Sequence, residues 1–159
     1  MGRCLLPTPS MSTTTTTTFV IDYCERVLVH DIRITAAGSS PNTDGIHVQG
    51  SNHVTITNVG IRTGDHCISI APGTTNFWIK HVACDPGHGI SLGKGYEEKG
   101  VENVTVKMAV FTRTHNGLRI KTWGRPGGWC SSTPPCRMCT TPSSSTKITA
   151  LATKDAPTR

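Results

Sequence analysis

The sequence has no long hydrophobic run. No segment approaches the roughly 18 apolar residues that a helical membrane span requires, so we expect no membrane insertion. The start, MGRCLLPTPSMSTTTTTT, offers only Leu5 and Leu6 as an apolar part, which is too short for a secretory signal. A sustained helical period is also missing, which argues against a fold built from amphipathic helices.

Aromatic and charged residues are scarce. Aromatic residues make up 5% of the chain and charged residues 16%, with 16 Lys and Arg against 10 Asp and Glu. Most of the net charge of +6 falls within residues 124–159. No cluster of basic residues alternates with aromatic ones, so we expect no nucleic-acid partner.

Composition divides the chain into three parts. Residues 1–20 form a low-complexity start that includes the threonine run Thr13 to Thr18. Residues 124–159 are rich in Pro, Ser, Thr and Gly, and we expect them to be either disordered or read in a shifted frame. The middle part, residues 21–123, is therefore the part that we expect to fold.

A repeat organises the middle part. Four segments align: DGIHVQG from Asp44, HCISIAPG from His66, HGISLGKG from His88 and NGLRIKTW from Asn116. The first two intervals between their starts are equal and the third is longer. Each segment follows an alternating, β-branched run, which indicates pairs of short strands. One pair cannot bury its own apolar face, so the repeat predicts an all-β solenoid: an incomplete, right-handed parallel β-helix of about four coils.

In such a fold, equivalent residues of successive coils stack about 4.8 Å apart. The side chains expected inside are Ile46, Val48, Ile68, Ile70, Ile90, Leu92, Leu118 and Ile120. Those expected outside are His47, Ser69, Ser91, Arg119 and Lys121. The stacking also forms one polar column, which consists of Asp44, His66, His88 and Asn116. Acids and imidazoles beside two cations predict a site for an anionic group.

Four short motifs resemble a known family. They are Asn42-Thr43-Asp44, Gly64-Asp65-His66, Gly87-His88-Gly89 and Arg119-Ile120-Lys121. In this order and spacing they resemble the signature motifs of the polygalacturonases, glycoside hydrolase family 28, and the texts SPNTDGIHV, PGHGIS and NGLRIKTW are most similar to plant exo-polygalacturonases. The resemblance runs from about Cys24 to Trp123. It implies a monomeric, secreted cell-wall protein that hydrolyses α-1,4-galacturonosyl bonds in pectin or polygalacturonate, without a cofactor or metal.

The resemblance also implies catalytic roles. Asp65 matches the general acid, Asp44 matches one of the carboxylates that hold the attacking water, and His88 matches the histidine that supports the acid. The family's reaction is inverting, which requires a carboxylic acid on one side of the bond and a water-activating carboxylate on the other. The column of coils can supply both.

Substrate binding and one disulfide are implied in the same way. Arg119 and Lys121 match the pair that grips the substrate carboxylate, which suits a guanidinium fork beside a point charge. Asn42, in the first motif, is expected to contribute to substrate binding. Cys67 and Cys84 match positions that are disulfide-bonded in the family.

His66 departs from the family pattern, because it stands where the family has a second acid. An imidazole can accept a proton, but its shape differs from that of a carboxylate, and its protonated form is positive. The change predicts activity lowered by about 10²- to 10⁴-fold. Two alternatives remain open: a β-helix that binds oligogalacturonate through Arg119 and Lys121 without cleaving it, and an unfolded product of a faulty gene model.

Three further patterns bear on metal binding and modification. His47, His66 and His88 with Asp44 could suggest a metal site, but ligands spaced so widely along the chain match no metal motif, so no metal is predicted. The CxxC in the tail, Cys136 to Cys139, lacks the second half of a zinc site. Asn103-Val104-Thr105 is a glycosylation sequon.

The tail also bears on the reading frame. Codons for TTPSSSTKIT can be chosen whose shifted reading spells HNPIIIDQDH, which closely resembles the NPIIIDQ motif of these enzymes. We therefore expect a change of frame between about Gly124 and Trp129, which the transcript sequence would test.

Overall fold

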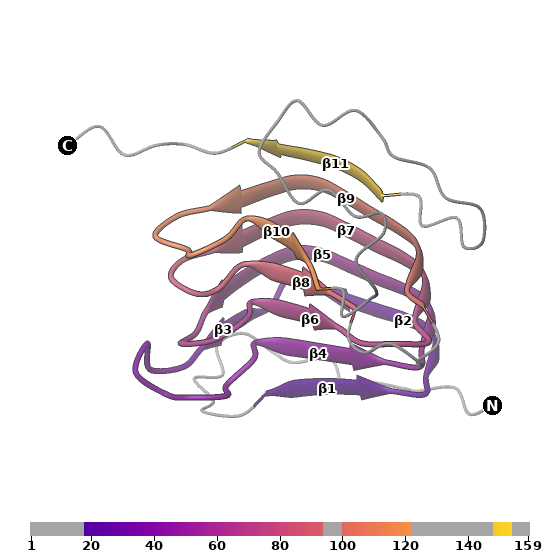
Figure 1. Cartoon of the computed structure of the whole chain (residues 1–159), viewed down its shortest axis with the longest axis horizontal. Helices are drawn as coiled ribbons and strands as arrows, with labels where there is room; N and C mark the ends of the chain where they lie inside the picture. The colour runs from indigo at the N-terminus through magenta and orange to yellow at the C-terminus, as the bar shows by residue number, and fades with distance from the viewer. Residues whose placement is uncertain (1–17, 94–99, 122–147, 154–159) are drawn as a thin grey trace, which may run out of the picture.

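The computed structural model describes residues 18–93, 100–121 and 148–153 (Figure 1). Every regular element in these ranges is a β-strand. None of the described segments is a helix long and apolar enough to cross a membrane. In chain order the strands are β1 (Phe19–Asp22), β2 (Glu25–His30), β3 (Arg33–Thr35), β4 (Ile46–Gln49), β5 (Asn52–Arg62), β6 (Ile68–Ile70), β7 (Thr75–Cys84), β8 (Ile90–Leu92), β9 (Glu102–Phe111), β10 (Leu118–Ile120) and β11 (Ile148–Thr153).

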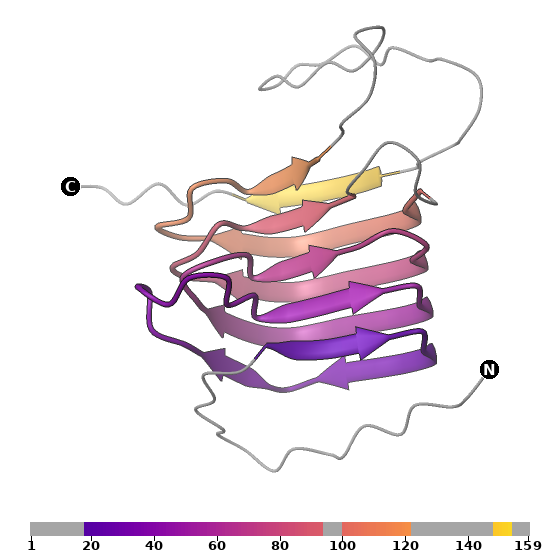
Figure 2. The same cartoon turned by 60° about the horizontal axis from the view of Figure 1, so that its bottom comes forward.

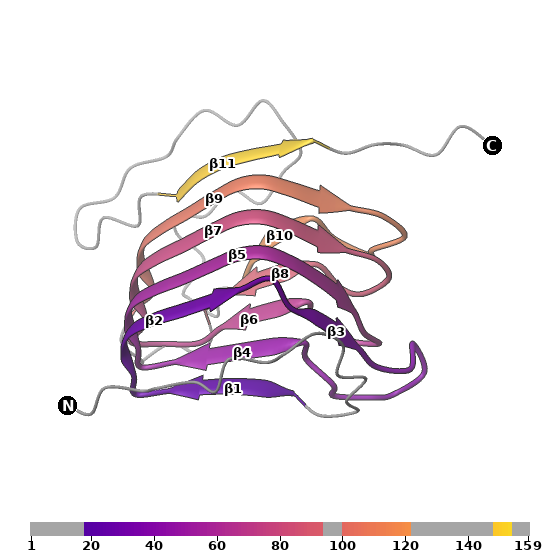
Figure 3. The same ribbon diagram turned by 180° about the vertical axis from the view of Figure 1, so that it is seen from behind.

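The strands form two parallel sheets. One has the order β1-β4-β6-β8-β10, and the other has the order β11-β9-β7-β5-β2, with β3 beside β5. The chain passes from one sheet to the other in each coil and advances along the stack (Figures 1 and 3). Figure 2 shows the short strands of the first sheet lying over the long strands of the second. The predicted parallel β-helix of about four coils is confirmed.

The register between coils follows the sequence repeat. Ile46 pairs with Ile68, Ile68 with Ile90, and Ile90 with Leu118. Strand β1 adds a coil before these, with Phe19 opposite Ile46. This strand begins at Phe19, inside the range 1–20 that sequence analysis placed outside the fold, so the first coil is longer than expected.

The core lies between the two sheets. Six of the predicted inward side chains are at most 2% exposed: Ile46, Val48, Ile68, Ile70, Ile90 and Leu92. The long strands add Val54, Ile56, Phe77, Ile79, Val104 and Val106, which are at most 1% exposed. The alternation of apolar residues thus identified the core face, because successive side chains of a strand point to opposite sides.

Two of the predicted inward or outward residues differ in exposure from the expectation. Ile120 is 47% exposed, because β10 is the last strand of its sheet in the described residues and has a neighbour on one side only. Leu118, on the same strand, is partly buried. Ser91 was expected outside but is 2% exposed, and Arg119 on β10 lies opposite it in the register.

Each long strand has two residues of equivalent register with positive φ, and it bends at the second of them. Asn58 in β5, His81 in β7 and Met108 in β9 have φ of 54°, 53° and 54°. This left-handed conformation is unusual for residues other than glycine. It shifts the phase of the alternation by one, so that Val54 and Ile56 before the bend and Val59 and Ile61 after it all face the core. The bend is therefore what lets one strand follow the curved wall of the coil.

A ladder of asparagines lines another edge of the stack. The Oδ1 atom of Asn52 accepts a hydrogen bond from Asn76 Nδ2 at 2.9 Å, and Asn103 Nδ2 donates to Asn76 Oδ1 at 2.6 Å. Asn103 is exposed and belongs to the predicted sequon. The amide nitrogen that would carry a glycan is thus already a donor in the ladder, and glycosylation at this position stays a prediction.

Most of the predicted tail, residues 124–159, lies outside the described residues. Strand β11 falls within that range and pairs in parallel with β9, with a register shift between Leu151 and Ala152. The expected change of reading frame in the tail stays a prediction.

The stacking of coils depends on glycine at Gly89. Its φ is +83°, and a Cβ at this position would collide with the carbonyl oxygens of Asn116 and Gly117 in the next coil. Gly89→Ala should therefore lower the free energy of unfolding by about 2–4 kcal/mol. Gly100→Ala is the matched control, because a Cβ there meets nothing within 4 Å. Urea unfolding of both variants measures the difference, and equal stabilities would contradict the proposed close contact.

Candidate functional site

The candidate site is formed by the loops that precede β4, β6 and β8. Backbone hydrogen bonds hold these loops in the register of the strands: Gly45 N donates to His66 O at 2.8 Å, and Cys67 N donates to Gly89 O at 2.8 Å. His88 N also donates to Asp65 O at 2.8 Å. The side chains of consecutive coils are therefore placed side by side at one edge of the sheet.

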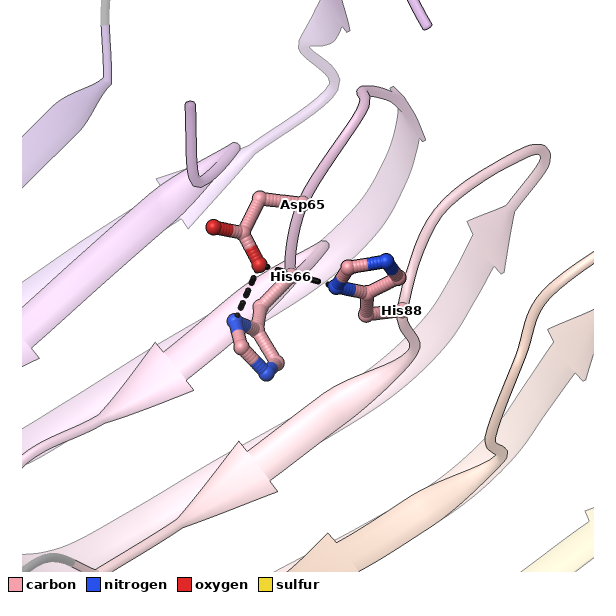
Figure 4. A group of neighbouring side chains, drawn as sticks. All are labelled: Asp65, His66 and His88. Atoms are coloured by element: carbon pink, nitrogen blue, oxygen red, sulfur yellow. Dashed lines mark hydrogen bonds and ion pairs between the residues drawn. The ribbon is translucent and has the colours of Figure 1, made fainter. Parts of the chain in front are cut away.

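Asp65 lies at the centre of the site (Figure 4). Its Oδ1 atom is 2.8 Å from Nδ1 of His66 and 3.0 Å from Nδ1 of His88. The Asp65 side chain is 19% exposed, so the carboxylate is partly shielded from solvent. One carboxylate oxygen is thus shared by two imidazoles, one from its own coil and one from the next.

His66 is the most deeply buried polar residue of the site. Its Nδ1 atom also lies 3.2 Å from Asp44 Oδ1, and its backbone N–H donates to the same oxygen at 3.2 Å. Because Nδ1 faces two carboxylate oxygens, it must carry a hydrogen in a neutral ring. The Nε2 atom is buried and has no hydrogen-bond partner among the described residues. The ring is therefore oriented by its contacts through Nδ1.

The Asp44 carboxylate is affected by opposing influences. Burial raises its pKa, whereas the hydrogen bonds and positive charge of His66 lower it, with a smaller contribution from His47. The lowering influences prevail, so the pKa of Asp44 lies below its ordinary value. Asp44 is consequently ionised at neutral pH. Its Oδ2 atom lies 3.7 Å from Nδ1 of His47.

His115 belongs to the site but was missed by sequence analysis. Its ring stacks on that of His88, with ring centroids 4.7 Å apart, and the His88 ring meets that of His66 edge-on at 5.5 Å. The signal was present, because His115 directly precedes Asn116, the first residue of the fourth repeat segment. The repeat alignment selects only the column itself, and His115 stands one position before it.

An ion pair joins two of the loops at this edge. Arg113 Nε and Nη2 donate to the two oxygens of Asp85 at 2.7 and 2.9 Å. This hydrogen-bonded contact lowers the pKa of Asp85 and raises that of Arg113. The pair links the loop that carries His88 to the loop that carries His115. It was not predicted from the sequence.

The predicted substrate-binding residues lie on or beside the first sheet. Arg119 is exposed on β10, opposite Ser91 in the register, and Lys121 follows the same strand. Asn42 is exposed, two residues before Asp44. In the part of the chain that the structure describes, no ion pair involves Arg119 or Lys121.

The donor set of the site differs from the one that the sequence suggested for a metal. The side chains of Asp65, His66 and His88 place one potential ligand atom each within 4.8 Å of one another. The sequence-based alternative had named His47 and Asp44 beside His66 and His88, and it did not include Asp65. Among the described residues, Asp65, His66 and His88 are therefore the side chains that are placed to bind one cation together.

Comparison with known proteins identifies the family. A sequence profile described as glycosyl hydrolases family 28 matches residues 10–133. The chain belongs to this family. The predicted resemblance is confirmed over the whole of the described β-helix up to β10.

Relatives of this family 28 chain come from several plants. A polygalacturonase of Prunus persica is 60% identical over 110 residues, which cover 67% of this chain and 28% of the relative. An exopolygalacturonase of Platanus acerifolia is 53% identical over 103 residues, covering 63% and 27%. One of Zea mays is 50% identical over 103 residues, covering 63% and 25%. The chain thus spans little more than a quarter of the length of these relatives.

The predicted disulfide is not formed in the structure of this family 28 chain. Cys67 and Cys84 are free, buried thiols on consecutive coils. The hydrogen bond that the Cys84 thiol donates to Cys67 and the burial of the site both raise the pKa of Cys84. The two sulfur atoms are therefore neighbours, and the disulfide stays a prediction.

Mild oxidation should link these thiols. We expect a Cys67–Cys84 disulfide to form in glutathione buffer and to raise the free energy of unfolding by about 3 kcal/mol, as for other loops of similar length. Peptide mapping by mass spectrometry without reduction measures the link, and Cys84→Ala is the control that cannot form it. Recovery of both residues as separate alkylated peptides after oxidation would contradict the prediction.

Proposed function

We propose that this protein is a glycoside hydrolase of polygalacturonate whose turnover is impaired by His66. The reaction would be the inverting hydrolysis of α-1,4-galacturonosyl bonds, and the pectin of the plant cell wall would be its setting. Family membership and the names of the plant relatives support the reaction class. The position of Asp65 between two imidazoles is the observation that carries the assignment of roles.

Asp65 is suited to the role of the general acid. Its Oδ1 atom is held by His66 and His88, which fixes the orientation of the carboxyl group. Its Oδ2 atom makes no hydrogen bond within the described ranges, so this oxygen is available to carry a proton to a leaving group. His88, steadied by its stack on His115, acts as a positioning residue for the acid. A fixed donor is what general acid catalysis needs.

The placement of His66 accounts for the proposed impairment. Asp65 Oδ1 and Asp44 Oδ1 lie 2.8 and 3.2 Å from the same imidazole nitrogen, so their separation cannot exceed the sum of these two distances. Inverting glycosidases separate their carboxyl groups by roughly 6.5–9.5 Å, which is more than that sum, to make room for the attacking water. The imidazole thus occupies the space between the acid and Asp44. It also replaces the carboxylate that would share in holding the water.

Arg119 and Lys121 are suited to holding the substrate. Neither forms an ion pair with a described carboxylate, so both charges are available for the carboxylate of a galacturonate unit. Arg119 continues the outward column of His47, Ser69 and Ser91, which leads along the sheet beside the site. A guanidinium can bind a carboxylate through two parallel hydrogen bonds. Asn42 lies exposed near the first coil of this surface.

Replacing His66 with aspartate tests the proposal. In the complete protein, His66→Asp should raise the rate of hydrolysis of polygalacturonate by about 10²- to 10⁴-fold, because it restores a carboxylate for the attacking water. The release of reducing ends measures the rate. His81→Gln, an exposed histidine in the bend of β7, is the matched control and should leave the rate unchanged.

A second variant identifies the acid. Asp65→Asn in the His66→Asp background should abolish the gain, because the amide cannot donate the proton in the same way. No gain from His66→Asp would refute the impaired-site proposal. Binding of oligogalacturonate without any release of product, in both backgrounds, would instead favour the non-catalytic alternative.

A further inference from the structure

The cluster of acids and imidazoles has the arrangement of a metal site. The donor atoms are Asp44 Oδ1, Asp65 Oδ1, His66 Nδ1 and His88 Nδ1, with neighbouring separations of 2.8, 3.0 and 3.2 Å. Ligand atoms on a tetrahedral ion with bonds of about 2.0–2.1 Å lie about 3.3 Å apart. Asp65, His66 and His88 place their donor atoms within 4.8 Å of one another, so these three can reach one ion together. Asp44 Oδ1, 3.2 Å from His66 Nδ1, must move toward the ion to become the fourth ligand.

From this geometry we propose that Asp44, Asp65, His66 and His88 together bind one divalent transition-metal ion, of the class represented by Zn²⁺. Two carboxylates and two neutral imidazoles carry a total charge of −2, which one divalent ion neutralises. Mixed nitrogen and oxygen donors favour zinc, copper or nickel over magnesium or calcium, which prefer oxygen alone. Because a ligand nitrogen must present its lone pair, the ring hydrogens of both histidines reside on Nε2 when the ion is bound.

His66 is the residue that creates this donor set. It is 9% exposed, and its ring is oriented through Nδ1, which faces both carboxylates, while the buried Nε2 has no partner among the described residues. The nitrogen is thus fixed in the centre of the cluster before any ion binds, so little conformational entropy is lost on binding. An aspartate at this position would leave His88 as the only nitrogen donor.

The long spacing between the ligands fits this fold. Metal motifs on a helix or in a loop use ligands a few residues apart, which was the reason for predicting no metal from the sequence. In a β-helix one full coil separates neighbours in space, so Asp44, His66 and His88 occupy adjacent positions of a stack. The ligands of a metal site that spans several coils are therefore separated in the sequence by about one coil length.

This inference does not depend on the proposed hydrolysis. A bound ion would occupy one oxygen each of Asp44 and Asp65, and it would therefore compete with any reaction that uses them. Binding itself can be measured without substrate, so the failure of one proposal leaves the other standing.

Titration of the untagged protein with Zn²⁺ tests the inference. After treatment with a chelator and its removal, isothermal titration calorimetry should show one ion bound per chain. His66→Gln and His88→Gln should each weaken binding by about tenfold or more. His81→Gln lies outside the cluster and should bind as the unchanged protein does. Replacing Cys130, Cys136 and Cys139 with serine in all samples removes competing thiols of the tail.

The site can also be observed without any substitution in it. Long-range ¹H–¹⁵N spectra of the protein with the same three serine replacements should show Zn²⁺ shifting the Nδ1 resonances of His66 and His88, while those of His53 and His81 stay unchanged. Absence of stoichiometric binding, or binding that leaves these two Nδ1 resonances unmoved, would overturn the proposal. This measurement decides the question even if a histidine variant fails to fold.

Discussion

The hydrogen bonds between successive coils are the constraint on which the rest of the structure depends. Each coil is held one strand spacing from the next in strict parallel register, from Ile46 through Ile68 and Ile90 to Leu118. The same register continues into the loops, where backbone bonds from Gly45 to His66 and from Cys67 to Gly89 keep polar side chains in line. Core and site are thus two parts of one stack, and a change of register would disrupt both.

The fold could be predicted because period and alternation are both local signals. The regular spacing of similar segments determined which residues stack, and the β-branched alternation determined which of them face inward. The exposures of Ile120 and Ser91 were not predicted, for a different reason. Exposure depends on what lies beside a strand in the sheet, and a repeat unit contains no information about whether it is central or terminal.

The candidate site was predictable as a column but not as a set of contacts. The motifs placed Asp44, Asp65, His66 and His88 together, and the structure brings them into direct contact. Which nitrogen of His66 faces which carboxylate depends on side-chain rotation and packing, which a repeat alignment does not encode. His115 was missed because it stands one position outside the column, although its ring reaches across to His88.

The unequal lengths of the coils have a consequence for how such a chain can vary. The coil from His88 to Asn116 is longer than the two before it, and most of the extra length falls between the end of β8 at Leu92 and the start of β9 at Glu102. The acids and imidazoles lie before the short strands, whereas this insertion lies after one of them. Length can therefore change at one end of the short strands while the chemistry at the other end keeps its neighbours. The solenoid separates the part of each coil that is free to diversify from the part that must stay in line.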